Sequence, residues 1–592
     1  MDAAPPATGP TERGPGTGWL ALLCVLAGLA GTFRVFDFDA FWHTRTGRWI
    51  WEHRAVPLRD PFAHTSDGPL RYTEALAQLV FHLFDRVFGG FGLSLLGGAL
   101  AGAFAAAVLL ATARPERLRW ESRAVAVACV FLASSFRFGP KTELISFSLW
   151  AVLTHLVSRH EEAAETSAPG VRDHARFLVA VAALSFLWGN CHRAGGLVPF
   201  GLGAVAVAWA LRAATRPLAP VAVGALLVSV FALTLNSGGA YYFLSTFAVT
   251  TRATFAANFA QQRPVSWEFL VDVDPWVFPL VALFLLGALV RRRLDASLAL
   301  AVTSLSLPFV SLRFIPFAAV GMAPFAARAV DALIDRGAAA TRLRLPSIAR
   351  GVVVLSAAAL PMAAQQVARH APSIVGLGVV RWRVPVGAAD FLRQHPPVGR
   401  MWNSYDFGGY LMYALAPGQK VFVDGRYDTP YSQAFVEESI LAQTDDSVLA
   451  RQFERFGVTY AVIACSRLEE TRYPWLLSSP EWGLVYFDDV AAVVVKRTKE
   501  NAPLLAAHEY RAVSPRDAIR RASSLAGLTG EQRALFEQEV ERAVRDAPDS
   551  IRAHVLRALV LRARGELEAA KREAETARAL GRSRRVSVDL RL

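Results

Sequence analysis

Two aspartates and a histidine stand close together near the start of the chain, in the stretch FDFDAFWH at 36–43. Asp37 and Asp39 are two residues apart, and in an extended segment this spacing points both carboxylates to one side. Such a pair can hold a divalent cation, Mg²⁺ or Mn²⁺, or one acid can act as general base on a hydroxyl group. Alternatively, the acids only cap the end of an apolar segment, and the spacing leaves both interpretations open.

Other polar residues with chemical potential lie in short connections between apolar runs. The turn LWGNCHRAGG at 187–196 presents Asn190, His192 and Arg193, although a glycine-rich turn with an interfacial tryptophan explains it equally well. His43 and five cations, in loop one and in other connections, can contact a phosphate or can simply anchor in lipid headgroups. The five cations are Arg45, Arg137, Lys141, Arg263 and Arg313. Together they predict a cationic collar around the two aspartates, suited to an anionic lipid-linked phosphate.

The chain that must position these residues has the composition of a membrane protein. It has 592 residues, of which 53% are hydrophobic and 19% charged, whereas a soluble domain carries about 25% charge. Apolar runs of the length that crosses a bilayer recur between residues 18 and 368. We predict about eleven spans: 18–36, 90–112, 122–138, 142–158, 175–190, 196–212, 218–236, 274–290, 296–311, 314–331 and 350–367.

The arginine distribution predicts which way these spans run. If residues 1–17, a Pro- and Gly-rich segment that we expect to be disordered, lie in the cytoplasm, almost all the inner connections are rich in arginine. Loop one, 37–89, and all residues after 368 then lie outside. Much of the net charge of +13 is therefore a topology signal, and we expect no nucleic-acid partner.

The outer C-terminal part divides into two regions. Residues 369–500 alternate helical and strand patterns, with strands predicted at 400–402, 420–423, 460–464, 484–487 and 491–496, and predict a small α/β domain. Its loops carry Asp424 and Arg426 in the segment DGRYD, where they contact a sugar or acceptor, or serve turn chemistry alone. Residues 501–592 are helical and charged. The stretch 546–580 is similar to one tetratricopeptide unit, with Gly565 at the turn; we expect this tail to dock on the α/β domain or on another protein.

Several motifs together resemble one superfamily. They are DFDAFWHTRTGRWIWEHRAVPLRDPFAHT after the first span, the LWGNCHRAGG turn, NSYDFGGYLMYALAPGQKVFVDGRYDTPYSQ, and PEWGLVYFDDVAAVVVKR. These resemble the GT-C polytopic membrane glycosyltransferases, in a bacterial branch related to protein mannosyltransferases. The resemblance implies a catalytic acid in loop one, which falls on Asp39 first and Asp37 second, and a second loop-one acid, which falls on Glu74.

The leading hypothesis is therefore a glycosyltransferase of the bacterial cytoplasmic membrane. It would move a sugar from a polyprenyl-phosphate donor to an acceptor on the outer face, with the basic groups or a metal stabilising the leaving phosphate. A non-enzymatic scaffold that keeps this architecture and binds a partner through its tail is the alternative. A lipid flippase or transporter ranks last, because few charged or helix-breaking residues lie at mid-span.

Overall fold

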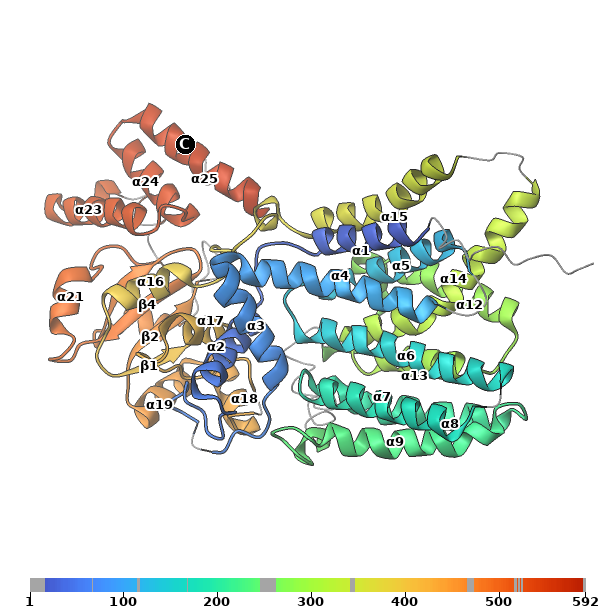
Figure 1. The fold of residues 1–592 in the computed structure, drawn as a ribbon. Helices are drawn as coiled ribbons and strands as arrows, with labels where there is room; N and C mark the ends of the chain where they lie inside the picture. Colours follow the sequence, from blue (N-terminus) through green and yellow to red (C-terminus); the bar gives the residue numbers. More distant parts are fainter. Residues whose placement is uncertain are drawn as a thin grey trace, which may run out of the picture.

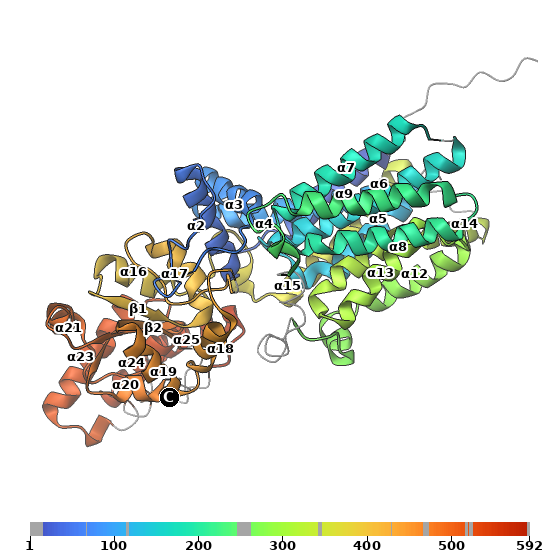
Figure 2. The ribbon, with the colours of Figure 1, turned by 90° about the horizontal axis from the view of Figure 1, so that it is seen from below.

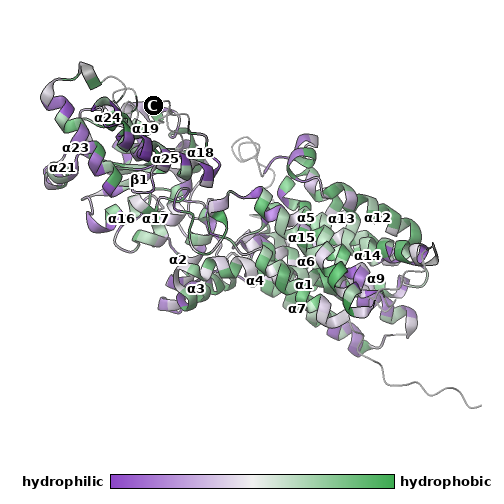
Figure 3. Cartoon of the chain, turned by 90° about the horizontal axis from the view of Figure 1, so that it is seen from above, coloured by the Kyte–Doolittle hydropathy of each residue, from purple (hydrophilic) through white to green (hydrophobic). Residues whose placement is uncertain are grey.

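The computed structural model shows a helical bundle beside a smaller lobe built on a sheet (Figure 1). It describes residues 16–588 except 67, 114–117, 168, 245–261, 341–345, 428, 466–472, 516–518, 520–521 and 523–524. The predicted disordered segment 1–17 lies outside this part, apart from residues 16 and 17, which begin the first helix. Hydropathy separates the two parts as well, since apolar residues dominate the bundle helices and the lobe is mixed (Figure 3).

Every predicted span corresponds to a helix of the bundle. In chain order these are α1 (Gly16–Ala30), α4 (Gly92–Thr112), α5 (Trp120–Ser134), α6 (Thr142–Thr166), α7 (Val171–Gly189), α8 (Val198–Leu211), α9 (Ala219–Leu233), α12 (Val277–Arg291), α13 (Ala296–Ser306), α14 (Ile315–Ala340) and α15 (Ser347–Arg369). Within the described residues, five helical stretches are long and apolar enough to cross a membrane by length and composition, and α1, α12 and α13 belong to shorter apolar helices. The chain is thus a multi-pass membrane protein, while the count of eleven spans stays a prediction.

Loop one forms two helices between the bundle and the lobe (Figure 2). They are α2 (Phe38–His53) and α3 (Ala75–Phe88), which pack against each other. α3 continues through Gly89–Phe91 into α4, and the backbone turns at Gly89, whose φ is +57°. The apolar side of α2 enters the core of the lobe, since Phe41 is fully buried with residues of the sheet domain.

The sheet domain confirms most of the predicted α/β pattern. Its strands are β1 (Arg400–Asn403), β2 (Val458–Ala464), β3 (Trp482–Phe487) and β4 (Ala491–Lys496), in the order β1-β2-β4-β3, with only β1 and β2 parallel. Its helices are α16 (Val386–Gln394), α17 (Gly408–Leu415), α18 (Gln433–Leu441), α19 (Asp446–Phe456), α20 (Pro474–Ser478) and α21 (Ala502–His508).

The strand predicted at Lys420–Val423 is wrong. This segment bonds to a side chain and to loop one, because Phe422 N donates to Asn403 Oδ1 at 2.8 Å and Val421 N donates to Phe62 O at 3.0 Å. Val421 forms only an isolated bridge with Ala63. Loop one therefore takes the place where a further strand was expected.

The C-terminal tail contains α23 (Gly530–Asp546), α24 (Ile551–Ala563) and α25 (Leu567–Arg584). The last two form a helical hairpin, with Gly565 in its turn at φ +81°, and their likeness to a tetratricopeptide unit stays a prediction. The tail docks on the sheet domain, as expected, and Asp489 is the main anchor. Its carboxylate accepts from the amides of Ile551 and Arg552 at 2.6 and 2.9 Å and from Arg584 at 2.9 Å. A partner protein for the tail stays a prediction.

Candidate active site

A polar cavity of about 380 Å³ lies where loop one, the bundle and the sheet domain meet. Residues from all three parts line it. The predicted site residues among them are Asp37, Asp39, His43, Glu74, His192, Arg193, Arg313 and Arg426. Because α1 is followed at once by α2, and short turns join α5 to α6 and α7 to α8, the sequence brings these side chains to one end of the bundle.

Asp37 caps α2 and also pairs with a lysine. Its Oδ1 accepts from the amide of Asp39 at 2.9 Å, which stabilises the first turn of the helix. Its Oδ2 lies 2.5 Å from Nζ of Lys141, at the start of α6. The capping interpretation is therefore right for Asp37, and the carboxylate still lines the cavity.

Asp39 lies in the first turn of α2 and lines the cavity. Its Oδ1 accepts from the indole N–H of Trp42 at 2.9 Å. Gly425, in the DGRYD segment, approaches so closely that a Cβ there would lie 2.6 Å from this oxygen. Burial and the charge of Asp37 raise the pKa of Asp39 to about 7, against the opposing effects of Trp42 and Lys141. Near neutral pH this carboxyl can therefore both accept and give up a proton.

Glu74 and His43 form a second buried pair on the cavity wall. Their side chains approach to 3.6 Å, between His43 Nε2 and Glu74 Oε2, and both are almost fully buried. Burial keeps the pKa of His43 well below its ordinary value, so its ring is neutral. Burial also raises the pKa of Glu74 to about 7, although the charge of Arg193 opposes the shift. The second loop-one acid therefore titrates in the same range as Asp39.

The neighbours of His192 determine which of its ring nitrogens carries the proton. Trp188 Nε1 donates to Ser146 Oγ at 2.8 Å, so the serine hydroxyl is free to donate to His192 Nδ1, 2.7 Å away. The amide of Ala194 also donates to Nδ1, at 3.4 Å. Burial lowers the pKa of His192 to about 3, and the neutral ring must then carry its proton on Nε2. This N–H is a donor on the wall of the cavity.

Guanidinium groups face these acids from three turns. Arg313, in the turn Leu312–Phe314 before α14, lines the cavity, and its Nε has no hydrogen-bond partner among the residues that the structure describes. Arg193 contacts the ring of Tyr72 and donates to Thr429 at 3.4 Å. Arg137 is paired with Glu143, at 2.9 Å from its Nε. Arg137, Lys141, Arg193 and Arg313 thus line the cavity, whereas Arg45 and Arg263 of the predicted collar do not, and binding of a phosphate by these cations stays a prediction.

Besides Asp424, three predicted contact residues do not line the cavity. Arg45 is on the other side of α2, where its guanidinium packs over Phe62. Asn190 ends α7, and its amide nitrogen donates to Phe186 O and Leu235 O, both at 2.9 Å. Arg263 has an exposed side chain, and its carbonyl accepts from the amide of Leu312. These contacts give Arg45 and Asn190 packing and capping roles, and contact of the three residues with a substrate stays a prediction.

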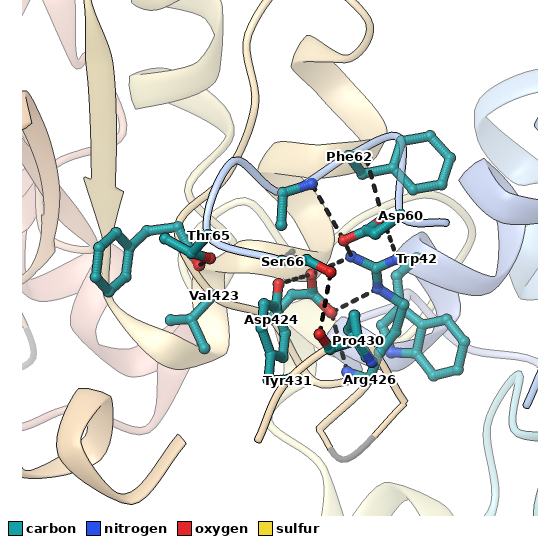
Figure 4. A network of polar contacts seen from close by, with 12 residues as sticks. Trp42, Asp60, Phe62, Thr65, Ser66, Val423, Asp424, Arg426, Pro430 and Tyr431 are labelled. Carbon is teal, nitrogen blue, oxygen red and sulfur yellow. Dashed lines mark hydrogen bonds and ion pairs between the residues drawn. The ribbon is translucent and has the colours of Figure 1, made fainter. Parts of the chain in front are cut away.

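Asp424 and Arg426 join loop one to the sheet domain (Figure 4). Arg426 donates to both oxygens of Asp60, at 2.7 and 2.8 Å, and to both oxygens of Asp424, at 2.8 and 2.7 Å. Tyr431 donates to Asp424 at 2.7 Å. These contacts use four of the five N–H groups of Arg426. We call Asp60, Asp424, Arg426 and Tyr431 the clasp; it holds Gly425 against Asp39, and substrate contact by its members stays a prediction.

Some lining residues were not among the predicted site residues. Tyr405 and Asp406 reach the cavity from the sheet domain, while Lys141, which was predicted only as a member of the cationic collar, reaches it from the turn before α6. The signal for the first two was the motif DFGG: a Cβ on Gly409 would lie 2.4 Å from Phe38 O. These glycines let α17 pack directly on α2, and this brings Asp406 beside loop one.

The aspartate pair does not fit a divalent cation as the residues are arranged. One oxygen of Asp37 caps α2 and the other pairs with Lys141, and Trp42 binds Oδ1 of Asp39. A cation would have to displace the lysine ammonium. Within the described residues, no three Asp, Glu, His or Cys side chains are grouped to hold a metal ion. We derive no step through a metal, and the assignment of Mg²⁺ or Mn²⁺ to Asp37 and Asp39 stays a prediction.

Solved structures of similar fold include two kinds of membrane protein. The archaeal oligosaccharyltransferase AglB from Archaeoglobus fulgidus, in complex with an inhibitory peptide and a dolichol-phosphate, matches with a TM-score of 0.56 and 14% identity, over 76% of this chain and 69% of that one. The Archaeoglobus fulgidus oligosaccharyltransferase in complex with Zn and sulfate matches with a TM-score of 0.53 and 15% identity, over 93% and 86%. ArnT from Cupriavidus metallidurans in the apo state matches with a TM-score of 0.50 and 14% identity, over 81% and 98%.

No family model matches the chain, and no curated protein matches it in sequence. The structural likeness nevertheless spans most of the molecule, bundle and outer lobe together. The chain thus has the fold of the GT-C membrane glycosyltransferases, which the sequence motifs predicted. At these identities the likeness defines the fold, and function has to be argued from the cavity.

Proposed function

We propose that the protein transfers a sugar from a polyprenyl-phosphate donor to an acceptor on the outer face of the bacterial cytoplasmic membrane. One observation carries this proposal: a single cavity holds an acid of pKa about 7, Asp39, together with the guanidinium groups of Arg193 and Arg313. A base and a phosphate-binding group are the two elements that a displacement at a phosphate-linked sugar requires. An oligosaccharyltransferase of the same fold binds a dolichol-phosphate, which supports a lipid phosphate as part of the donor.

Asp39 is the general base in this proposal. Its Oδ1 is held by Trp42, so Oδ2 is the oxygen available to accept the proton of an acceptor hydroxyl or amide. A pKa of about 7 keeps a substantial fraction of this carboxyl ionised at neutral pH while leaving it basic enough to take a proton. Lys141 supports this state by neutralising Asp37, whose charge otherwise raises the pKa of Asp39 further.

Other residues of the cavity, Arg313, Arg193 and His192, would bind the leaving phosphate. When the bond between the anomeric carbon and the phosphate oxygen breaks, the phosphate keeps the electron pair and its negative charge increases. Arg313 and Arg193 can hold that charge with bidentate hydrogen bonds, and the Nε2–H of His192 adds a neutral donor. Protonation of the leaving group is then not needed.

The resulting reaction is one in-line displacement. The acceptor oxygen or nitrogen forms a bond to the anomeric carbon, the carbon–phosphate-oxygen bond breaks, and the acceptor proton moves to Asp39. The products are the glycosylated acceptor and polyprenyl phosphate, with inversion at the anomeric carbon. The finer choice of sugar and acceptor depends on residues such as Tyr405 and Asp406, which the sheet domain contributes to the wall.

Transfer by the purified protein tests this function. We would reconstitute the full chain in liposomes with undecaprenyl phosphate carrying radiolabelled glucose, mannose or N-acetylglucosamine, and measure loss of donor and label in acceptors from a membrane extract. We expect one donor to be consumed, and Arg313→Gln to slow the reaction while Arg313→Lys restores part of it. No consumption of any donor, or equal rates for wild type and Arg313→Gln, would contradict the proposal.

A further inference from the structure

A second cavity, of about 470 Å³, lies between α1 and α15 on the outside of the bundle. The two helices run side by side (Figure 1). The walls are apolar, with Leu26, Leu29 and Phe33 on one side and Leu355, Leu360 and Val367 on the other. Its volume is in the range of about 300–1,000 Å³ that ligand pockets have. We call it the α1–α15 groove.

The groove opens toward the membrane. Leu29 and Leu360 are 65% and 67% exposed, although both belong to apolar helices of the bundle. The end of the groove near Phe33 and Val375 lies where both helices leave the bundle toward the sheet domain. Hydrocarbon can therefore enter it sideways from the leaflet that faces this domain.

One buried polar side chain in the groove has no hydrogen-bond partner within the described part of the chain. Gln366, in the last turn of α15, is 6% exposed, and neither its amide nitrogen nor its oxygen makes a hydrogen bond to a described residue. It lines the groove one turn before His370. A buried amide without partners costs free energy, so a ligand that supplies a donor or an acceptor at this depth is favoured.

Four arginines surround the same end. Arg585 donates to the carbonyls of Val367 and Ala368 and so ties the tail to the end of α15. Arg369 is paired with Asp274. Arg34 and Arg383 are exposed; Arg34 donates to the carbonyl of Ser373, and Arg383 lies 5.0 Å above the ring of Phe36.

Arg369, Arg383 and Arg585 are near enough to His370 for their charges, after burial, to lower its pKa, to about 4. Among the described residues, neither Arg34 nor Arg383 has a carboxylate partner within ion-pair distance. The end of the groove thus presents positive charge to the membrane surface.

We infer that the α1–α15 groove binds one anionic phospholipid from the leaflet beside the sheet domain. An acyl chain would fill the apolar walls, the amide of Gln366 would meet an ester carbonyl, and Arg34 and Arg383 would hold the phosphate. This site is separate from the cavity of Asp39, although Phe36 lines that cavity and contacts the ring of His370. The inference does not depend on the proposed transferase activity.

Lipid titration of the purified full-length protein, followed by native mass spectrometry, tests this site. The probes are dioleoylphosphatidylglycerol and, with the same chains but no net charge, dioleoylphosphatidylcholine. Each arginine near a membrane surface strengthens binding of an anionic lipid about fivefold. We therefore expect Arg34→Gln with Arg383→Gln to weaken binding of phosphatidylglycerol about 25-fold and to weaken binding of phosphatidylcholine much less, because the choline ammonium already neutralises its phosphate.

The matched control is Arg381→Gln, which removes an exposed arginine two residues from Arg383 that is paired with Asp390 instead. We expect it to bind phosphatidylglycerol like the wild type. Ala363→Trp, which fills the groove, should abolish binding of the tightly held lipid while its thermal unfolding midpoint shows that it is folded. Equal binding of the two lipids by the wild type, or undiminished binding by the double variant or by Ala363→Trp, would overturn the inference.

Discussion

Replacing Arg426 by methionine should open the clasp between loop one and the sheet domain. The side chains of Asp60 and Asp424 are fully buried, and that of Arg426 is 4% exposed. Methionine keeps most of the volume and removes the only cation of the clasp, so two carboxylates are left buried without it. Breaking a buried ion pair in this way costs about 3–5 kcal/mol.

Two further variants set a scale for this effect. Tyr431→Phe removes one hydrogen bond to Asp424, with an expected cost of about 1 kcal/mol. Arg426→Lys keeps the charge and loses the two bidentate contacts, so its cost should fall between the others. Burial works to raise the pKa of Asp424, but the charge and hydrogen bonds of Arg426 outweigh it and hold the pKa below its ordinary value. The clasp should therefore be intact above about pH 4 and be lost only as pH falls through that depressed pKa.

Hydrogen exchange of loop one measures this opening directly. The reporter amides are His64 and Val421, which join loop one to the sheet domain at 3.1 and 3.0 Å. A loss of about 3–5 kcal/mol corresponds to exchange faster by about two to four orders of magnitude in Arg426→Met, provided that opening is local. Exchange in Arg426→Met no faster than in Tyr431→Phe would refute the clasp as the link that holds Gly425 at Asp39.

Other predictions concern the acids, the lysine and the tail. In a pH–rate profile, the transfer rate should rise with pH through about 7, as Asp39 loses its proton. Lys141→Gln should move this rise to higher pH, because the lysine charge lowers the pKa of Asp39. A rise at the same pH in the variant would contradict this. Because the folded state holds that proton more tightly than the unfolded chain, the thermal midpoint should fall as pH rises from about 4 through 7, and the fall should be smaller in Asp39→Asn. Since Lys141 occupies the place of a cation beside Asp37, chelation with EDTA should leave transfer unchanged, and full loss restored by Mg²⁺ or Mn²⁺ would show that the lysine is displaced. Asp489→Ala removes acceptors from the start of α24 and should speed limited proteolysis of the tail, by about tenfold for a loss of 1–2 kcal/mol, whereas unchanged cleavage would mean that the tail is held elsewhere.

The bundle helices were predictable because each depends on a local pattern. An apolar run of sufficient length specifies a helix wherever the backbone must satisfy its own hydrogen bonds. That Asp39, His43, His192 and Arg313 lie close together was also predictable, because each follows or precedes such a run at the same end of the bundle; their roles stay a prediction. Local sequence patterns were thus enough to predict most of the charged residues that line the cavity.

Long-range pairs were the part that local patterns did not reveal. Arg426 and Asp60 are 366 residues apart, and nothing in either segment identifies the other. Lys420–Val423 has the composition of a strand, but the side chain of Asn403 and the backbone of loop one take its hydrogen bonds. Arg45 and Asn190 have the residue types of a binding site, and only their orientation on α2 and at the end of α7 shows that they lie outside it.

Single-turnover transfer by Asp39→Asn is the most direct test of the account. The donor is the one that the wild-type protein consumes, and the matched control is Glu52→Gln, the same chemical change at an exposed position of α2 far from the cavity wall. Loss of a general base should slow sugar transfer by about 10²–10⁴-fold with donor binding retained, while Glu52→Gln transfers like the wild type. Equal transfer rates for Asp39→Asn and Glu52→Gln would contradict the assignment of Asp39 as the base.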